Sequence, residues 1–246
     1  YQNNVLGSLH LIECCVEAGV GLFVFSSSAA VYGNPAKLPV HEEAPTDPIN
    51  PYGRTKLITE WTLNDSAERA GSSPPLRYAA LRYFNVAGAS LDGALGQATP
   101  EATHLIKVAC EAACGKRDSV SIFGTDYDTK DGTCIRDYIH VEDLAAAHLG
   151  ALDYLATGGT SAVLNCGYGH GYSVREVLDM VRKVSGNDFS IRETGRRDGD
   201  PACLISDNRS IRKLLTWAPQ HNDLELICST AFQWERAKQG PKSRNG

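Results

Sequence analysis

Two mainly apolar strands separated by a long helix constrain the fold of this chain more than any other feature. The segments Leu22–Ser26 and Tyr78–Phe84 have the composition of strands that are buried on both faces. A helical pattern over Tyr52–Arg69 lies between them, and an apolar stripe with 3- and 4-residue spacing predicts a helix over Asn3–Glu17 before them. This alternation predicts an α/β fold in which helices connect the parallel strands of a doubly wound sheet.

Three residues near the ends of these elements have the chemistry of a proton-transfer site. Tyr52 and Lys56 are four residues apart in P-Y-G-R-T-K, so a helix places both side chains on one face. A lysine ammonium beside a tyrosine phenol stabilises the phenolate, which allows the phenol to act as a base. Ser28 follows a strand, so its hydroxyl is expected where ligands bind in open α/β sheets. A lone Y-x-x-x-K pair is more often a surface helix with a solvated lysine, and the surrounding elements favour the site.

The order of these elements resembles that of the short-chain dehydrogenase/reductase superfamily. The match runs from Tyr1 to about Gln239 and indicates the extended branch, whose members act on nucleotide sugars. Sugar dehydratases of that branch carry an Asp-Glu pair after the serine, whereas Ala29 and Ala30 stand there in this chain and cannot transfer protons. The motifs S-S-S-A-A-V-Y-G, R-Y-F-N-V-A-G and R-D-Y-I-H-V-E-D-L-A-A-A-H are most similar to those of the UDP-glucose 4-epimerases.

This resemblance implies an isomerase with a Rossmann-type fold and bound NAD, which interconverts UDP-glucose and UDP-galactose through a 4-keto sugar. It implies that Tyr52 is the base for the sugar 4-hydroxyl, that Ser28 hydrogen-bonds this hydroxyl, and that Lys56 holds the nicotinamide ribose. Asn3 and Phe84 match positions that touch the cofactor, although a helix N-cap and a core aromatic residue are the alternative roles. Other NAD-dependent epimerases, for N-acetylated hexosamines or uronic acids, are the alternative within this class.

Further positions match residues that contact the nucleotide sugar in the family, namely Asn85, Phe123, Arg136, Arg197 and Asp200. A guanidinium can bind two oxygens of a diphosphate at once, which suits the two arginines to that group. The alternatives are a surface ion pair for either arginine and a strand core for Phe123. Leu204 matches the wall that faces the sugar 2-substituent, and a one-residue shift would give Cys203 this place. Either is smaller than the tyrosine that excludes N-acetyl groups, and the alternative for Leu204 is an inward strand residue.

A Gly-rich turn for the dinucleotide pyrophosphate is absent before Ser28. No G-x-x-G-x-x-G segment occurs there, and the single methionine is Met180. By resemblance, about ninety residues with the first half of the cofactor domain precede Tyr1, so the chain is expected to be an N-terminally truncated fragment. The chain as given is therefore expected to be inactive, and a non-catalytic remnant is the competing hypothesis.

Residues 1–85 are predicted to form the remaining half of the NAD-binding domain. Residues 86–246 are assigned mainly to a smaller α/β domain for the nucleotide sugar, with about 124–170 returning to the first domain. The stretch Asn34–Pro51 has no hydrophobic period and is predicted to be a long surface loop. The second part is expected to contain helices over Thr99–Gly115 and Val141–Leu155, strands over Ser119–Phe123 and Ala162–Cys166, and capping boxes at Ser173–Glu176 and Asn222–Glu225.

Composition argues against several other functions. The net charge is -5 and no basic tract occurs, so a nucleic-acid partner is not expected. No apolar stretch has transmembrane length, and the 8 cysteines contain no C-x-x-C pair, so neither a membrane span nor a metal site is expected. The cysteines are interpreted as reduced thiols of a cytoplasmic protein, and the resemblance favours a homodimer. His140 and His148 lie on apolar segments and are expected to have structural roles rather than catalytic ones.

Overall fold

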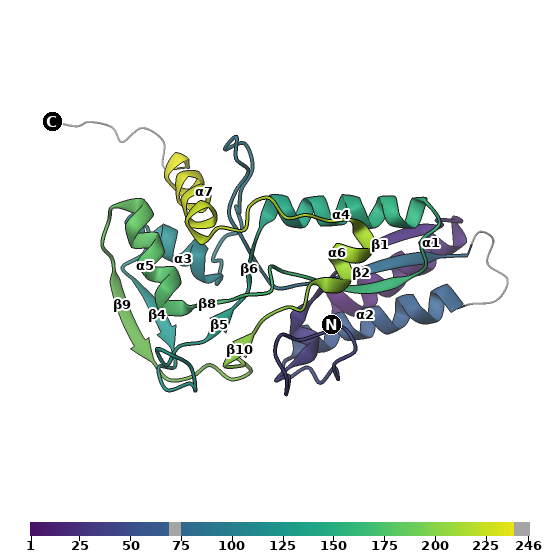
Figure 1. Cartoon of the computed structure of the whole chain (residues 1–246), viewed down its shortest axis with the longest axis horizontal. Coiled ribbons are helices and arrows are strands. Elements are labelled where there is room, and N and C mark those ends of the chain that lie inside the picture. Colours follow the sequence, from purple (N-terminus) through teal and green to yellow (C-terminus); the bar gives the residue numbers. More distant parts are fainter. Residues whose placement is uncertain (69–74, 239–246) are drawn as a thin grey trace. The chain divides into compact units, whose positions relative to one another are not determined.

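The computed structural model describes residues 1–68 and 75–238, which divide into two compact units (Figure 1). Unit 1 consists of Tyr1–Phe84, Leu144–His170 and Leu204–Ala218, and unit 2 of Asn85–Asp143, Gly171–Cys203 and Pro219–Gly246. Within the described residues, no helix is long and apolar enough to cross a membrane. The assignment of one domain to the cofactor and the other to the nucleotide sugar stays a prediction.

Unit 1 is built on a three-stranded parallel sheet with the order β1-β2-β7. Its strands are β1 (Leu22–Ser28), β2 (Arg77–Tyr83) and β7 (Ala162–Cys166). The register pairs Ser28 with Tyr83 and Tyr83 with Cys166, so all three strands end at the same edge. The predicted α/β fold with parallel strands is confirmed, and the strand at 162–166 returns to this sheet.

Helices lie on both faces of this sheet (Figure 1). They are α1 (Gly7–Glu17), α2 (Pro51–Glu68), α4 (Val141–Ala156) and α6 (Arg209–Leu215). Successive strand residues point to opposite faces, and Ser26 contacts α4 whereas Ser27 contacts α2. Beneath α1 and α2, a hydrophobic cluster fills the space against the sheet and consists of Ile12, Leu63, Leu76, Tyr78 and Ala80.

The N-terminal helix begins with a π-helical turn, η1 (Gln2–Leu6), which leads directly into α1. Asn3 lies inside this turn, and no side chain caps it, so an N-cap role for Asn3 is wrong. The neighbouring Asn4 contacts α2 instead, because its Nδ2 donates to Thr55 Oγ1 at 3.1 Å. The predicted helix over 52–69 is confirmed to Glu68, and Arg69 lies outside the described residues.

The segment between β1 and α2 is less exposed than a surface loop. It begins with a 3-10 turn, η2 (Ala29–Tyr32), in which the Tyr32 side chain is fully buried. Farther along, Val40 is also fully buried and pairs with Ser206 through an isolated bridge. The carbonyl oxygen of Val40 accepts a hydrogen bond from Asn165 Nδ2 at 2.8 Å. The predicted lack of regular structure over most of 34–51 is confirmed, but part of the segment belongs to the core of unit 1.

Unit 2 contains short strands and three helices that pack on one another. The helices are α3 (Leu105–Ala113), α5 (Val174–Ser185) and α7 (Leu224–Ala237). Parallel pairs are formed by β3 (Asn85–Ala87) with β6 (Tyr138–His140) and by β4 (Ser119–Phe123) with β9 (Ser190–Thr194). A third sheet has the order β10-β5-β8, with β5 (Ile135–Arg136), β8 (Tyr172–Ser173) and β10 (Cys203–Leu204).

Two predicted helix starts in unit 2 are wrong, and one is confirmed. The helix expected from Thr99 begins only after His104, since Glu101 has a φ of 51°, which a right-handed helix cannot contain. The last helix is capped by Asp223 rather than Asn222, because the Asp223 side chain accepts the backbone N–H of Glu225 at 2.8 Å. The capping box of Ser173 and Glu176 is confirmed at the start of α5.

Candidate active site

Each serine of the S-S-S motif at the end of β1 has a different partner. The Ser26 hydroxyl lies 2.9 Å from His148 Nε2, and Ser27 donates to the Glu60 carboxylate on the other face of the sheet. The Ser28 hydroxyl accepts the backbone N–H of Ala30 at 3.2 Å. This bond leaves the Ser28 proton available, so its hydroxyl can donate to a ligand at the strand end.

Tyr52 and Lys56 are side by side at the start of α2, as the four-residue spacing predicts. The Lys56 ammonium lies 5.7 Å from the centre of the Tyr52 ring and 5.0 Å from that of Phe25. Its Nζ donates to the carbonyl oxygen of Ser26 at 2.9 Å. Burial lowers the pKa of Lys56, whereas the Tyr52 side chain is 46% exposed. A held cation therefore lies beside a phenol that a substrate can reach.

Gly53 sets how closely α2 approaches the turn that follows Ser28. A Cβ atom at Gly53 would overlap the carbonyl oxygen of Ala30 and lie 2.9 Å from Pro48 Cβ. The Gly53 N–H donates to Asn50 Oδ1 at 2.8 Å, which fixes the first turn of the helix. Only glycine allows this approach, and it brings the Tyr52 backbone next to the end of β1.

A buried charged pair lies under the serine motif and was not predicted. Arg82 on β2 binds Glu60 on α2, with Nη2 2.6 Å from Oε2 and Nε 2.9 Å from Oε1. Both side chains are buried, and the same carboxylate accepts the Ser27 hydroxyl. The position of Arg82 within an otherwise apolar strand could have indicated this ion pair, because a buried cation requires an anionic partner.

Tyr32 extends this network toward β7. Its hydroxyl accepts from Arg82 Nη1 at 3.0 Å and donates to Asn165 Oδ1 at 2.7 Å. Burial raises the pKa of Tyr32 to about 12, although Arg82 acts in the opposite direction, so the phenol stays neutral. The Glu42 carboxylate also accepts the Asn165 N–H at 2.8 Å, which ties the loop before α2 to the sheet.

Two predicted cofactor residues have different environments in unit 1. Asn3 is exposed in the first helical turn. Phe84 is 7% exposed and belongs to a hydrophobic cluster with Tyr32, Leu57 and Leu204. A contact of either residue with a cofactor stays a prediction.

In unit 2, four of the predicted nucleotide-binding residues lie together in two pairs. Arg136, whose side chain is only 11% exposed, lies 3.6 Å from the Asp200 carboxylate. The Arg197 guanidinium lies over the Phe123 ring, 4.1 Å from its centre. An aromatic ring with a stacked guanidinium can hold a base and a phosphate, and an arginine–aspartate pair can bind a phosphate and a hydroxyl.

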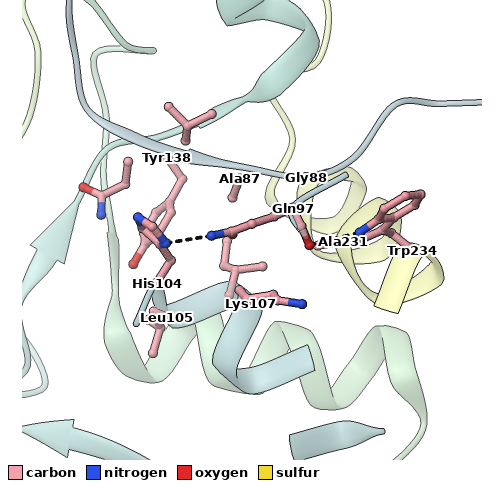
Figure 2. A pocket seen from close by; sticks show the side chains of 12 residues that line it. Ala87, Gly88, Gln97, His104, Leu105, Lys107, Tyr138, Ala231 and Trp234 are labelled. Carbon is pink, nitrogen blue, oxygen red and sulfur yellow. Dashed lines mark hydrogen bonds between the residues drawn. The ribbon is translucent and has the colours of Figure 1, made fainter. Parts of the chain in front are cut away.

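Asn85 lines a pocket in unit 2 that includes residues the sequence had not indicated (Figure 2). The other polar side chains at its wall include His104, Lys107, Tyr138 and Trp234. Gln97 Nε2 lies 2.9 Å from His104 Nδ1, which orients the imidazole. In the sequence, only the position of His104 immediately before a helix could have indicated a pocket residue. That position does not distinguish a ligand contact from an ordinary turn.

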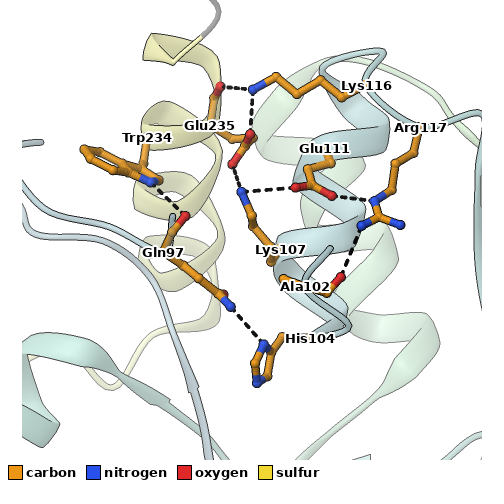
Figure 3. A network of polar contacts seen from close by, with 9 residues as sticks. All are labelled: Gln97, Ala102, His104, Lys107, Glu111, Lys116, Arg117, Trp234 and Glu235. Carbon is orange, nitrogen blue, oxygen red and sulfur yellow. Dashed lines mark hydrogen bonds and ion pairs between the residues drawn. The ribbon is translucent and has the colours of Figure 1, made fainter. Parts of the chain in front are cut away.

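A buried ionic network fixes one wall of this pocket (Figure 3). Lys107 on α3 binds Glu235 on α7, and it also binds Glu111 at 3.2 Å. Lys116 reaches the same Glu235 carboxylate at 2.5 Å. Trp234, next to Glu235, donates its Nε1–H to the Gln97 carbonyl oxygen at 3.1 Å (Figure 3). These contacts join α3, α7 and the segment before α3 into one rigid wall.

The two candidates for the sugar wall are adjacent on β10, and their environments differ. The Leu204 side chain is buried in the unit 1 cluster that contains Phe84 and Val40. The Cys203 side chain is half-buried in unit 2, where burial raises the pKa of its thiol and Arg136 opposes this shift. Cys203 thus has a charged phosphate-binding candidate as its neighbour, which favours the shifted alternative over Leu204.

All eight cysteines lie within the described residues, and none of them forms a disulfide there. Across residues 1–68 and 75–238, no group of three His, Cys, Asp or Glu side chains is arranged to hold a metal ion.

Known proteins that are similar to this chain include several UDP-glucose 4-epimerases. The NAD dependent epimerase/dehydratase family matches residues 1–167. The UDP-glucose 4-epimerase of Azospirillum brasilense is 54% identical over 237 residues, which cover 96% of this chain and 67% of that protein. The Brucella ovis UDP-glucose 4-epimerase, solved in complex with NAD, is similar with a TM-score of 0.90 and 43% identity, over 96% of this chain and 71% of that one. The UDP-Glc/GlcNAc 4-epimerase of Campylobacter jejuni has a TM-score of 0.79 and 55% identity, over 96% and 71% of the respective chains.

Proposed function

Because the chain belongs to the NAD dependent epimerase/dehydratase family, we propose that it interconverts UDP-glucose and UDP-galactose with NAD as cofactor. The observation that carries this proposal is the Lys56 ammonium, bound to the Ser26 carbonyl beside an accessible Tyr52 phenol. Ala29 and Ala30, which follow Ser28, offer no further acid or base. Such a site suits a reaction that returns every proton it removes, and it does not suit an elimination.

Lys56 on α2 and Ser28 at the end of β1 suit the hydroxyls of the nicotinamide ribose. An ammonium has three N–H donors, and the Ser26 carbonyl uses one of those of Lys56 within the described residues. The remaining donors suit the two ribose hydroxyls, and the Ser28 hydroxyl lies on the same strand end. Bound NAD would supply the hydride-transfer chemistry at the sugar C4.

The chain's own residues move and hold the proton. Tyr52 removes the proton of the sugar 4-hydroxyl and returns it when the sugar carbon is reduced again. Lys56 stabilises the phenolate form of Tyr52 by its positive charge, and Ser28 donates a hydrogen bond to the reacting oxygen. Because the same hydroxyl loses and regains the proton, the reaction needs no second proton donor.

Residues of unit 2 are proposed to hold the nucleotide. Arg136 and Arg197 supply guanidinium groups for the diphosphate, and the half-exposed Asp200 carboxylate can accept ribose hydroxyls. Phe123 is 38% exposed and offers a ring face to the base, while Asn85 offers an amide to the diphosphate or the sugar.

We further infer that N-acetylated UDP-sugars are slower substrates. Cys203, the favoured residue at the sugar wall, is smaller than a tyrosine, so the wall leaves room for an acetamido group. The similarity to the Campylobacter jejuni UDP-Glc/GlcNAc 4-epimerase supports this substrate range.

A homodimer in the cytoplasm is the proposed state of the protein. Leu11 on α1 and Trp61 on α2 are 54% and 58% exposed, and these large apolar side chains suit a self-association surface. Eight cysteines without a disulfide suit a reducing compartment.

The proposal is tested on the full-length protein by incubating it with NAD and UDP-glucose and measuring UDP-galactose. We expect Tyr52→Phe to lower kcat by about 10²–10⁴-fold, the size of a lost proton transfer, with UDP-glucose affinity retained in calorimetry. Tyr154→Phe is the control, because that hydroxyl lies 3.4 Å from Thr160 on the surface of unit 1. Substantial turnover by Tyr52→Phe would contradict the assignment of Tyr52 as the base.

A further inference from the structure

His148 is an ionisable residue that contacts the serine motif and that the proposed reaction does not use. It lies on α4, and its Nε2 is 2.9 Å from the Ser26 hydroxyl. Its Nδ1 is 2.9 Å from the carbonyl oxygen of Leu144, one helical turn earlier. The imidazole also lies beside the Tyr83 ring, with the two centres 6.5 Å apart.

The Leu144 carbonyl determines which nitrogen of the neutral imidazole carries the proton. A carbonyl oxygen only accepts, so Nδ1 must be the donor, and Nε2 is then the acceptor. The Ser26 hydroxyl therefore donates its proton to His148. In consequence, the direction of the Ser26 hydroxyl is fixed from α4 and not by solvent.

Ser26 is also the residue that holds Lys56. The Lys56 ammonium donates to the Ser26 backbone carbonyl, while the Ser26 side chain is bound by His148. One strand residue thus connects the imidazole on one face of the sheet with the ammonium beside Tyr52. Burial raises the pKa of Tyr83 and the neighbouring Tyr52 raises it too, while a side-chain hydrogen bond with Ser26 opposes this shift.

We propose that His148 is a positioning residue for the Tyr52–Lys56 pair, acting through the hydrogen bond that its Nε2 accepts from Ser26. The inference rests on the proposed function, because it assigns the pair a catalytic role that His148 supports. Ser27 is held by Glu60 from the opposite face, so the strand end is bound on both sides just before Ser28. Loss of the α4 contact removes one partner of the Ser26 hydroxyl and loosens the carbonyl to which Lys56 binds.

Two substitutions at His148 separate the hydrogen bond from the bulk of the ring. His148→Phe keeps a flat ring against Tyr83 but has no acceptor for Ser26. His148→Gln places an amide oxygen near the position of Nε2, and this oxygen can accept the Ser26 proton. A merely structural role of the ring predicts that Phe is tolerated better than Gln, whereas the proposal predicts the reverse.

Two readouts are measured on both variants. For epimerisation, we expect His148→Phe to lower kcat about tenfold, the size of one hydrogen bond, with KM within about twofold, and His148→Gln to retain kcat within about twofold. For the lysine itself, the acetylation rate of Lys56 by acetic anhydride is followed by peptide mass spectrometry, relative to the exposed Lys183. We expect this ratio to rise about fivefold in His148→Phe and to stay near wild type in His148→Gln.

The labelling ratio does not require turnover, so the two proposals can fail separately. If the full-length wild type shows no epimerisation, the proposed function fails, and the labelling ratio still decides the role of His148. If His148→Phe and His148→Gln behave alike in both readouts, the positioning role is wrong. Should His148→Phe fail to fold, Ser26→Ala removes the same hydrogen bond from the strand side and must raise Lys56 labelling in the same way.

Discussion

Arg82 and Glu60 form a bidentate ion pair beneath the serine motif, with nitrogen–oxygen distances of 2.6 and 2.9 Å. The pair joins β2 to α2 and is almost completely buried. Because the Glu60 carboxylate also accepts the Ser27 hydroxyl, the pair connects the middle of α2 to the strand that ends in Ser28. The position of Tyr52 and Lys56 therefore depends on charges that no substrate touches.

Removing one member of this pair is expected to be costly. Arg82→Met leaves the Glu60 carboxylate buried without its partner, so the free energy of unfolding should fall by about 3–5 kcal/mol in urea denaturation. Arg209→Met is the matched control, because the Arg209 side chain is 87% exposed in its pair with Asp207, and unfolding should be unchanged. Equal stability of the two variants would contradict a structural role for the buried pair.

Gly53 provides a test of how α2 is placed. Gly53→Ala should destabilise unit 1 by about 1–3 kcal/mol and lower kcat, since the added methyl group forces α2 away from the turn after Ser28. Gly150→Ala on α4 is the control. A Cβ atom there meets Leu215 at an ordinary 3.6 Å, so helix propensity should make this variant about as stable as wild type or more so. Thermal unfolding and steady-state kinetics on both variants decide the point.

Local spacing explains why part of the site could be predicted. The four-residue separation of Tyr52 and Lys56 acts within one helix, and the parallel pairing of β1 with β2 follows from two buried apolar runs joined by a helix. The partner of Arg82 could not be predicted from the sequence in this way. Its apolar surroundings indicate that an anion is needed, but the choice of Glu60 depends on how α2 lies across the sheet.

Unit 2 was less predictable for a physical reason. Strands of two or three residues, such as β5, β8 and β10, are too short to show a period of two. The helix expected at Thr99 illustrates the limit of capping signals, because Thr-Pro is equally typical of a turn, and Glu101 continues that turn. The pairing of Arg197 with Phe123 joins residues far apart in the sequence, and only the fold shows it.

The neighbours Arg196 and Arg197 allow a matched test of nucleotide binding. Arg197→Ala should raise the Kd for UDP by about 10–100-fold, because a charge-assisted contact to phosphate is lost. Arg196→Ala should leave the Kd within about twofold, since this guanidinium is bound to Asp126 at 2.8 Å and stacks on Tyr127. Calorimetry with UDP gives both values. An equal loss for the two variants would indicate a general electrostatic effect and not a specific phosphate contact.

Glu235 is expected to make the stability of unit 2 sensitive to acid. Burial alone would raise the pKa of Glu235, but hydrogen bonds from Lys107 and Lys116 hold it below its ordinary value of 4.5. A carboxyl whose pKa is lowered in the folded state stabilises the fold at every pH above its pKa in the unfolded state. This contribution is lost as the pH falls through its pKa in the folded state. Wild type should therefore lose more unfolding free energy than Glu235→Gln between about pH 6 and about pH 3, while Glu235→Gln is the less stable of the two near neutrality. Glu225→Gln removes an exposed partner of Lys183 and should keep the wild-type slope. Parallel slopes for wild type and Glu235→Gln in urea titrations across this range would show that the α3–α7 network does not depend on the ionised carboxylate.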